Sequence, residues 1–156
     1  LSVGPLIVGA VNRWSATAPR RGGVEIDGDG RFPADEERLS IALDALVENA
    51  LRYTGTGDEI TFRGGADMGR AVIEVSDTGA GIPPHDLDRI FDRFTRVHRD
   101  RDRARGGTGL GLAIVKAIID AHGGIIEATS APGVGTTFRI MLPGFTPAPG
   151  PVPALT

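Results

Sequence analysis

One short stretch of the chain combines four glycines with the start of a helix pattern. The sequence RGGTGLGLAIVKAI spans residues 105–118, and Gly106, Gly107, Gly109 and Gly111 fall within it. Glycine loses backbone entropy when it is ordered, whereas the first turn of a helix presents unpaired N–H groups that suit an anion. The stretch therefore predicts either a flexible loop with a helix cap or a cradle for a phosphate group.

Two common phosphate-binding motifs do not describe such a cradle. A P-loop requires GxxxxGK[ST], but the only lysine, Lys116, follows Val115. The dinucleotide fingerprint GxGxxG follows a strand, whereas the glycines here have a different spacing and follow an arginine-rich loop. A phosphate bound at this stretch would need a cradle of another design.

Two polar residues elsewhere have the chemistry to bind other parts of a nucleotide. Asp77 ends a predicted strand and precedes Gly79 and Gly81. Its carboxylate can accept a hydrogen bond from an amine, and the glycines would let a flat ring approach the backbone. Asn49 lies in a helix pattern, and its amide oxygen is a hard ligand that suits Mg²⁺. Taken alone, Asp77 also fits a strand-end turn and Asn49 the edge of a helix face.

These residues must be positioned by the elements that the hydrophobic pattern predicts. The strongest helix pattern covers residues 34–54, where apolar residues recur at intervals of three and four and Asp35 is the expected N-cap. Further helices are predicted at 3–18 and 109–122, and strands at 24–27, 59–65, 70–77, 125–131 and 136–142. The expected fold class is α+β, a two-layer sandwich in which three helices cover one face of a mixed, mostly antiparallel sheet.

Two segments fit no regular element. Residues 78–109 are long and mostly irregular, which is typical of a functional or mobile loop. The proline-rich tail that starts at Pro143 cannot form a helix or a central strand. We therefore expect one domain over residues 1–143 and a disordered tail over 144–156.

The composition excludes several classes of protein. Of 156 residues, 40% are hydrophobic and 24% are charged, and the net charge is −3 at pH 7. These values are ordinary for a globular domain and give no basic surface for nucleic acid. The chain has no cysteine, so a disulfide or a thiolate metal site is impossible. The sequence also contains no apolar run long enough for a transmembrane helix and no basic segment of a signal peptide.

Five motifs, taken together and in order, resemble a known family. They are ALVENALRYT, DTGAGIP, IFDRFTRV, GGTGLGLAIV and GVGTTF. Their order and spacing over roughly residues 20–142 resemble the ATP-binding catalytic domain of sensor histidine kinases, within the Bergerat-fold (GHKL) ATPases. The resemblance implies a Bergerat fold, ATP and Mg²⁺ as ligands, and a mobile lid over about residues 84–108.

The resemblance also implies roles for individual residues. Asn49 would coordinate Mg²⁺, Asp77 would bind the adenine amine, and Thr137 would close the adenine side. The remaining contacts to the nucleotide would come from the pocket floor, the end of the long helix and the phosphate loop: Gly79, Gly81 and Ile82; Arg52 and Tyr53; Gly107, Thr108, Gly109, Leu110 and Gly111. Phe91 and Phe94 would anchor the lid.

The implied catalytic residues are Asn49, Glu48, Arg93 and Arg96. The two arginines are candidates for the γ-phosphate. Glu48 lies about 100° around the helix from Asn49, where it would contact a metal-bound water or act as a base toward the acceptor histidine. Hydrolytic members of the superfamily carry a glutamate four residues before the asparagine, where this chain has Ala45. Efficient ATP hydrolysis therefore lacks its general base.

The resemblance further implies that the γ-phosphoryl group passes to a histidine outside this domain. His85, His98 and His122 do not lie in a long acceptor helix, so the acceptor is expected on a dimerisation domain of the same parent chain or on a separate protein, with a response regulator downstream. The domain is expected on the cytoplasmic side, without direct membrane or nucleic-acid contact. An anti-sigma-factor-type serine kinase and a non-catalytic ATP-binding interaction module are the alternatives, and IFDRFTRV favours the histidine class.

Overall fold

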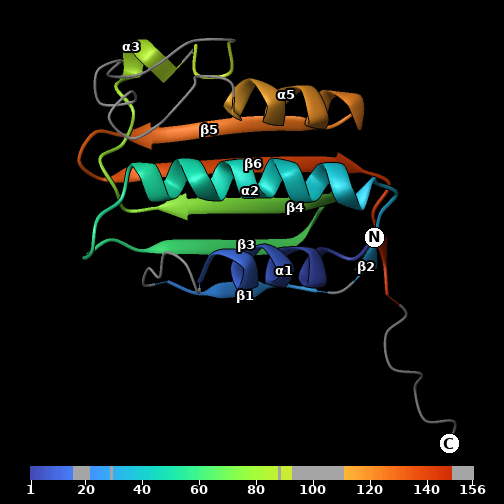
Figure 1. Cartoon of the computed structure of the whole chain (residues 1–156). Helices are drawn as coiled ribbons and strands as arrows, with labels where there is room; N and C mark the ends of the chain where they lie inside the picture. The colour runs from blue at the N-terminus through green and yellow to red at the C-terminus, as the bar shows by residue number, and fades with distance from the viewer. Residues whose placement is uncertain (16–21, 29, 88, 93–110, 149–156) are drawn as a thin grey trace, which may run out of the picture.

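The chain folds into a sheet and a layer of helices on one of its faces (Figure 1). The computed structural model describes residues 1–15, 22–28, 30–87, 89–92 and 111–148. Its helices are α1 (Val3–Ser15), α2 (Glu36–Arg52), α3 (Pro84–Leu87) and α5 (Gly111–Ala121). Its strands are β1 (Val24–Ile26), β2 (Gly30–Arg31), β3 (Ile60–Asp67), β4 (Arg70–Asp77), β5 (Ile125–Ala131), β6 (Gly135–Pro143) and β7 (Thr146–Pro147).

Five strands form the main sheet in the order β1-β3-β4-β6-β5. β1 runs parallel to β3, and the other neighbouring pairs of this sheet are antiparallel. Helices α1, α2 and α5 cover one face of the sheet, which we call the helix face, and we call the opposite one the open face (Figure 1). The predicted two-layer α+β sandwich is therefore confirmed, including the hairpin of β3 and β4.

The hydrophobic pattern explains how α2 lies on the sheet. Leu39, Leu43 and Leu46 recur at helical spacing and are buried in the core. Alternate residues of β4, such as Ile73 and Val75, are buried against the helix layer, as the two-residue period of a strand requires. This packing holds the C-terminal ends of α2 and β4 at the same end of the molecule (Figure 1).

Hydrogen bonds at the helix ends join α2 to α5. Asp35 is the N-cap of α2, as predicted, because its carboxylate accepts a hydrogen bond from the Arg38 N–H at 3.1 Å. His122, just after α5, accepts from the Asp35 N–H through Nε2 at 3.1 Å and donates from Nδ1 to the Ile118 carbonyl at 2.8 Å. His122 therefore has a structural role where α2 and α5 meet.

The chain after Pro143 is ordered further than expected. Phe145 packs against the core, and its N–H donates to the Gly69 carbonyl at 3.1 Å. The following strand β7 pairs antiparallel with β2 in a two-stranded sheet. Proline is compatible with such a short edge strand because only one side of it is paired. The expectation of a disordered tail from residue 144 is therefore wrong for residues 144–148, and residues 149–156 lie outside the described ones.

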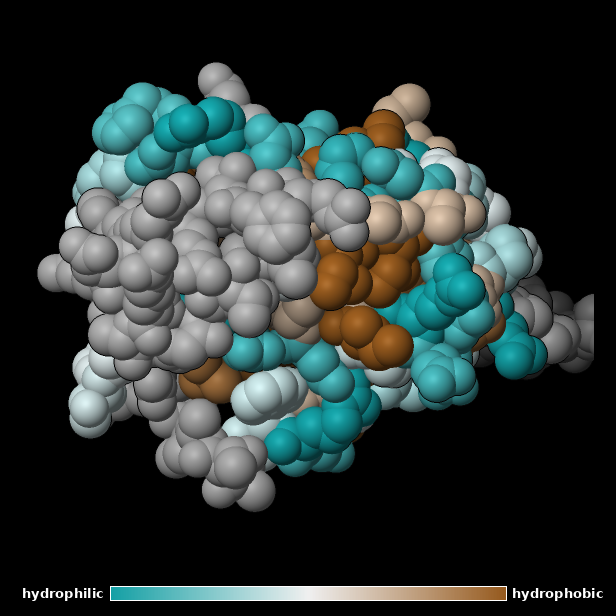
Figure 2. Space-filling model, turned by 45° about the horizontal axis from the view of Figure 1, so that its top comes forward, coloured by the Kyte–Doolittle hydropathy of each residue, from teal (hydrophilic) through white to brown (hydrophobic). Residues whose placement is uncertain are grey.

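The outer surface of the helix layer is mixed in polarity. Figure 2 shows hydrophobic residues on the side of the molecule formed by α5 and its neighbours, with hydrophilic residues around them. Ile114 of α5 and Ile125 of β5 are 46% and 49% exposed. Of the described helices, none combines the length and the hydrophobicity needed to cross a membrane.

Candidate functional site

The buried polar side chains of the described residues are Asn49, Asp77 and Thr136. Asn49 is near the C-terminal end of α2, Asp77 ends β4, and Thr136 is near the start of β6. Burying a polar group costs free energy unless it is paired, so buried polar side chains that lie near one another point to a functional site. The three residues come from the end of the molecule at which α2 and β4 terminate (Figure 1), so this end is the candidate site.

Asp77 is the buried ionisable group of this site. It is 8% exposed, and its Oδ1 accepts a hydrogen bond from the Gly79 N–H at 2.9 Å. Burial raises the pKa of Asp77 above its ordinary value. The backbone N–H groups of Gly79 and Thr136 partly offset this rise, and the negative charge of the nearby Asp58 adds to it. The site thus holds a desolvated carboxyl group whose oxygens can accept hydrogen bonds from a ligand.

The segment after Asp77 passes between α2 and the turn that joins β5 to β6. The Ala80 N–H donates to the Tyr53 carbonyl at 3.1 Å, and the Ala80 carbonyl accepts from the Gly133 N–H at 2.8 Å. A Cβ atom on Gly79 would lie 2.1 Å from the Tyr53 carbonyl oxygen. Gly81 has a φ of +77°, and a Cβ atom there would lie 2.3 Å from the Ala131 carbonyl oxygen. Both glycines are therefore required by close backbone packing, whereas the sequence suggested the approach of a ligand ring.

Ser130 of β5 ties this segment to β6. Its Oγ accepts a hydrogen bond from the Ile82 N–H at 2.7 Å and donates to the Gly135 carbonyl at 3.0 Å. The same Oγ lies 2.9 Å from the Thr136 hydroxyl oxygen. Ile82 is buried, as expected for the floor of a pocket, but sequence reasoning identified neither Ser130 nor Thr136.

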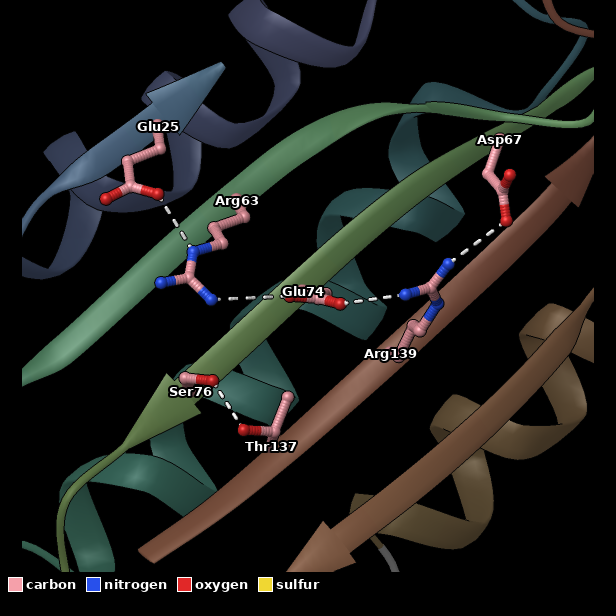
Figure 3. Close-up of polar contacts among 7 residues, drawn as sticks. All are labelled: Glu25, Arg63, Asp67, Glu74, Ser76, Thr137 and Arg139. Carbon is pink, nitrogen blue, oxygen red and sulfur yellow. Dashed lines mark hydrogen bonds and ion pairs between the residues drawn. The ribbon is translucent and has the colours of Figure 1, made fainter. Parts of the chain in front are cut away.

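The structure places Thr137 on the face of the sheet opposite to that of Asp77. In the pairing of β4 with β6, Asp77 is opposite Thr136, and Ser76 is opposite Thr137. Because successive side chains of a strand point to opposite faces, Thr136 shares the helix face with Asp77. Figure 3 shows Thr137 on the open face, where its hydroxyl contacts Ser76 at 2.5 Å. The expected position of Thr137 is wrong, and the burial of Phe138, two residues after Thr136, is a signal that could have decided it.

The end of α2 contributes the other predicted side chains. Asn49 is 8% exposed, and Arg52 and Tyr53 are partly buried one turn further on. An Arg52 terminal nitrogen lies 3.6 Å from Glu48 Oε1, and the side chains of these two residues are 19% and 61% exposed. Glu48 is thus a surface residue paired with Arg52. Position 45 of α2 is an alanine that packs against the core, and it therefore carries no carboxyl group.

Only part of the predicted lid and phosphate loop is described. Ile90 is buried, and the Phe91 ring packs edge-on against Phe138 with ring centroids 6.1 Å apart, so the start of the lid segment contacts the core. Gly111 begins α5 and is exposed. The other residues predicted there lie outside the described ones: Arg93, Phe94, Arg96, Gly107, Thr108, Gly109 and Leu110.

The donor set suits a magnesium ion that also binds phosphates. Within the described residues, no three histidine or carboxylate side chains come close enough together to hold a metal ion. Mg²⁺ is commonly bound by one or two protein oxygens, with phosphates and waters completing its shell. The amide oxygen of the buried Asn49 is a ligand of this kind, and Arg52 beside it has the charge for a phosphate.

Comparisons with known proteins give the class of this fold and site. Residues 34–145 match the family model described as histidine kinase-, DNA gyrase B- and HSP90-like ATPase. The chain is 48% identical over 121 residues to the sensor protein DivL of Caulobacter vibrioides, which is 77% of this chain and 15% of DivL. It is 46% identical over 109 residues to the sensor protein SrrB of Staphylococcus aureus, which is 70% of this chain and 19% of SrrB.

Solved structures agree with these matches. The mycobacterial sensor histidine kinase MprB superposes with a TM-score of 0.84 at 28% identity, over 95% of this chain and 99% of that one. Full-length ShkA in complex with AMPPNP gives a TM-score of 0.79 at 30% identity, over 96% of this chain and 31% of that one. The chain belongs to the family of histidine kinase-, DNA gyrase B- and HSP90-like ATPases. Within that family it is a histidine kinase ATP-binding catalytic domain, and it spans less than a fifth of the length of DivL or SrrB.

Proposed function

We propose that this domain binds Mg²⁺-ATP at the end of α2 and β4, and that it transfers the γ-phosphoryl group to a histidine on a separate domain or protein. The observation that carries the proposal is the buried Asp77 carboxyl group, held by the Gly79 N–H beside Thr136 in a chain of this family. A buried carboxylate that accepts few protein hydrogen bonds has lone pairs left for a ligand amine.

The adenine end of the nucleotide is assigned to Asp77 and Thr136. Asp77 would accept from the 6-amino group, and Thr136 takes the role that the sequence suggested for Thr137, because it shares the face and the register position of Asp77. Ile82 forms the floor beneath the base, and Gly79 and Gly81 allow the chain to follow this path. Two acceptors and an apolar floor suit an amino-substituted flat ring.

The phosphate end is assigned to α2 and to the loop before α5. Asn49 would hold Mg²⁺, and Arg52 and Tyr53 would approach the phosphates. Mg²⁺, when bound, supplies positive charge that neutralises the phosphate oxygens during transfer. Gly107, Thr108, Gly109, Leu110 and Gly111 would wrap the phosphates, and Arg93 and Arg96 would stabilise charge on the γ-phosphate.

Two features of the chain favour transfer over hydrolysis. Ala45 provides no base to activate water, so ATP would persist until an acceptor docks. Glu48 is exposed beside Arg52, where it can reach the proton of an incoming acceptor histidine. Among the histidines of the described residues, His122 is engaged between two helices, and His85 is 79% exposed on the short helix α3 beside Asp86. We therefore place the acceptor on another domain, with a response regulator further downstream.

Titration calorimetry of the chain with ATP, with and without Mg²⁺, tests the nucleotide assignment. We expect binding that Mg²⁺ strengthens and that Asp77→Asn weakens. An unchanged affinity of Asp77→Asn would refute the adenine assignment. Transfer is tested by adding a histidine-bearing dimerisation domain and radiolabelled ATP and then exposing the product to acid. An acid-labile phosphoprotein supports a histidine kinase, an acid-stable one supports a serine kinase, and binding without transfer supports an interaction module.

A further inference from the structure

Ser130 occupies the point at which three segments of the site meet. Its hydroxyl group, on β5, contacts the Ile82 N–H in the segment after β4 and, at the start of β6, the Gly135 carbonyl and the Thr136 hydroxyl. Ile82 and Ser130 are 48 positions apart in the sequence, and their bond joins the floor of the proposed adenine pocket to β5. Ser130 itself is partly buried and lies on the helix face, beside Thr136.

The hydrogen-bonding capacity of a serine hydroxyl fixes the direction of each bond. A hydroxyl has one proton to donate and two lone pairs that accept. The Ile82 N–H uses one lone pair at 2.7 Å, and the carbonyl of Gly135, which can only accept, takes the proton at 3.0 Å. The remaining contact, 2.9 Å to Thr136 Oγ1, must then use the second lone pair. Thr136 is therefore the donor in that bond, and its own proton is no longer available to a ligand.

The other donors at this edge are also engaged. The Gly79 N–H donates to Asp77 Oδ1 at 2.9 Å, and the Thr136 N–H faces the same carboxyl group. The Ile82 N–H is bound to Ser130. Among the described residues of this edge, the polar groups left to face a base are the Asp77 carboxylate and the lone pairs of the Thr136 hydroxyl, and both accept hydrogen bonds.

We propose that Ser130 is a positioning residue that sets base selectivity, because it consumes the Thr136 proton, so that the described residues of this edge present acceptors alone. This inference rests on the proposed ATP site. Such an edge pairs with the 6-amino group of adenine, whereas a 6-oxo purine brings a carbonyl oxygen against the same lone pairs. Without Ser130, Thr136 regains a free proton and can donate it to that carbonyl oxygen. Ser130 thus acts on the base through Thr136 and does not touch it.

The test compares ATP with inosine triphosphate, which carries an oxygen in place of the 6-amino group and a proton on N1. Calorimetry on the full chain should give the wild type a preference for ATP of at least about tenfold. In Ser130→Ala, we expect ATP to bind roughly five- to tenfold more weakly and the ATP preference to fall several-fold. Ser130→Thr keeps a hydroxyl group and should restore the preference. Ser76→Ala removes the hydroxyl group that pairs with Thr137 on the open face and should change neither affinity.

Each outcome has a distinct meaning. A Ser130→Ala variant that binds ATP more weakly with an unchanged preference would overturn the selectivity role and leave the ATP site intact. A wild-type chain that binds neither nucleotide would overturn the proposed function and this inference with it. Thermal unfolding checks that the variants are folded. If Ser130→Ala does not fold, Ser130→Cys replaces it, because sulfur keeps the packing while it is a poor hydrogen-bonding partner, and the same fall in preference is expected.

Discussion

The two faces of the sheet use similar side chains for different purposes. On the helix face, Thr136 contacts Ser130 and lies beside Asp77 under the helix layer. On the open face, the next residue, Thr137, contacts Ser76 among charged side chains (Figure 3). Thr136 is 4% exposed and Thr137 is only partly buried. The comparison shows that two neighbouring residues of one type differ in burial and in the hydroxyl group that each contacts.

The charges of the open face satisfy one another across the strands. Arg63 Nε lies 2.9 Å from Glu25, and Arg139 lies 3.2 Å from Glu74 and 3.4 Å from Asp67 (Figure 3). Exposed pairs of this kind contribute only about 0–1 kcal/mol each to stability. Asp77 on the other face has no such cationic partner among the described side chains, and burial raises its pKa. A carboxyl group in that state is suited to a ligand more than to the stability of the fold.

The largest effect is expected at Asn49, which is buried near the C-terminal end of α2, and Asn12, which is exposed on α1 in the same helix layer, is its matched control. Asn49→Ala removes the proposed Mg²⁺ ligand, so we expect phosphoryl transfer to fall by more than about a hundredfold, while part of the nucleotide affinity remains. Asn12→Ala should leave transfer unchanged. Transfer to a dimerisation domain, measured at saturating ATP, checks both. Normal transfer by Asn49→Ala would show that the metal is held elsewhere.

Asp77 and Glu74 offer the same test within one strand, because they lie on opposite faces of β4. Asp77→Asn replaces one acceptor oxygen that would face the ligand with an amide NH₂ group. A hydrogen bond to a charged group contributes about 1.5–3 kcal/mol, so its loss should weaken ATP affinity roughly ten- to hundredfold. Glu74→Gln should leave the affinity unchanged. Calorimetry measures both variants. Equal losses in the two variants would contradict the separation of the faces.

The adjacent threonines give a smaller and more specific effect. Valine matches threonine in shape, so Thr136→Val and Thr137→Val remove one hydroxyl group each. We expect Thr136→Val to weaken ATP binding roughly fivefold, the equivalent of about one net hydrogen bond. Thr137→Val should bind ATP like the wild type, because its hydroxyl group contacts Ser76 on the other face. The opposite result would return the role to Thr137 and would require a different register between β4 and β6.

These pairs also show how far the sequence could predict the site. The period of the apolar residues predicted α2, the β3–β4 hairpin and the place of Asp77 at a strand end, because these features depend on neighbours along the chain. The choice between Thr136 and Thr137 depended on which residue shares a face with Asp77. The apolar Phe138 shows within β6 which threonine points to the core, but the pairing with Asp77 follows from the register of two strands. Ser130 gave no signal, since its partner Ile82 is 48 positions away. The strands β2 and β7 are still further apart in sequence, since Arg31 pairs with Thr146, 115 positions later.

The pH dependence of stability provides a weaker test of the same carboxyl group. Burial raises the pKa of Asp77 above its ordinary value of 3.8, so the folded chain binds this proton more tightly than the unfolded chain does. The contribution of Asp77 to folding therefore becomes more favourable as the pH falls through the raised pKa toward 3.8. The free energy of unfolding of the wild type, relative to that of Asp77→Asn, should rise between pH 7 and pH 4. Urea unfolding at several pH values measures it, and a relative decrease would contradict the burial of this group.

The smallest effect is expected on the open face. Arg139→Met keeps most of the side-chain stem and removes the charge that pairs with Glu74 and Asp67. Because these side chains are partly exposed, the free energy of unfolding should fall by about 1 kcal/mol or less. The difference should shrink between 0.1 M and 1 M salt, where the screening length drops from about 10 Å to about 3 Å. ATP affinity should not change, since Arg139 is on the face away from Asp77. A loss of ATP affinity without a loss of stability would mean that the two faces are coupled through the sheet, and the difference between Thr136 and Thr137 would then no longer be one of position alone.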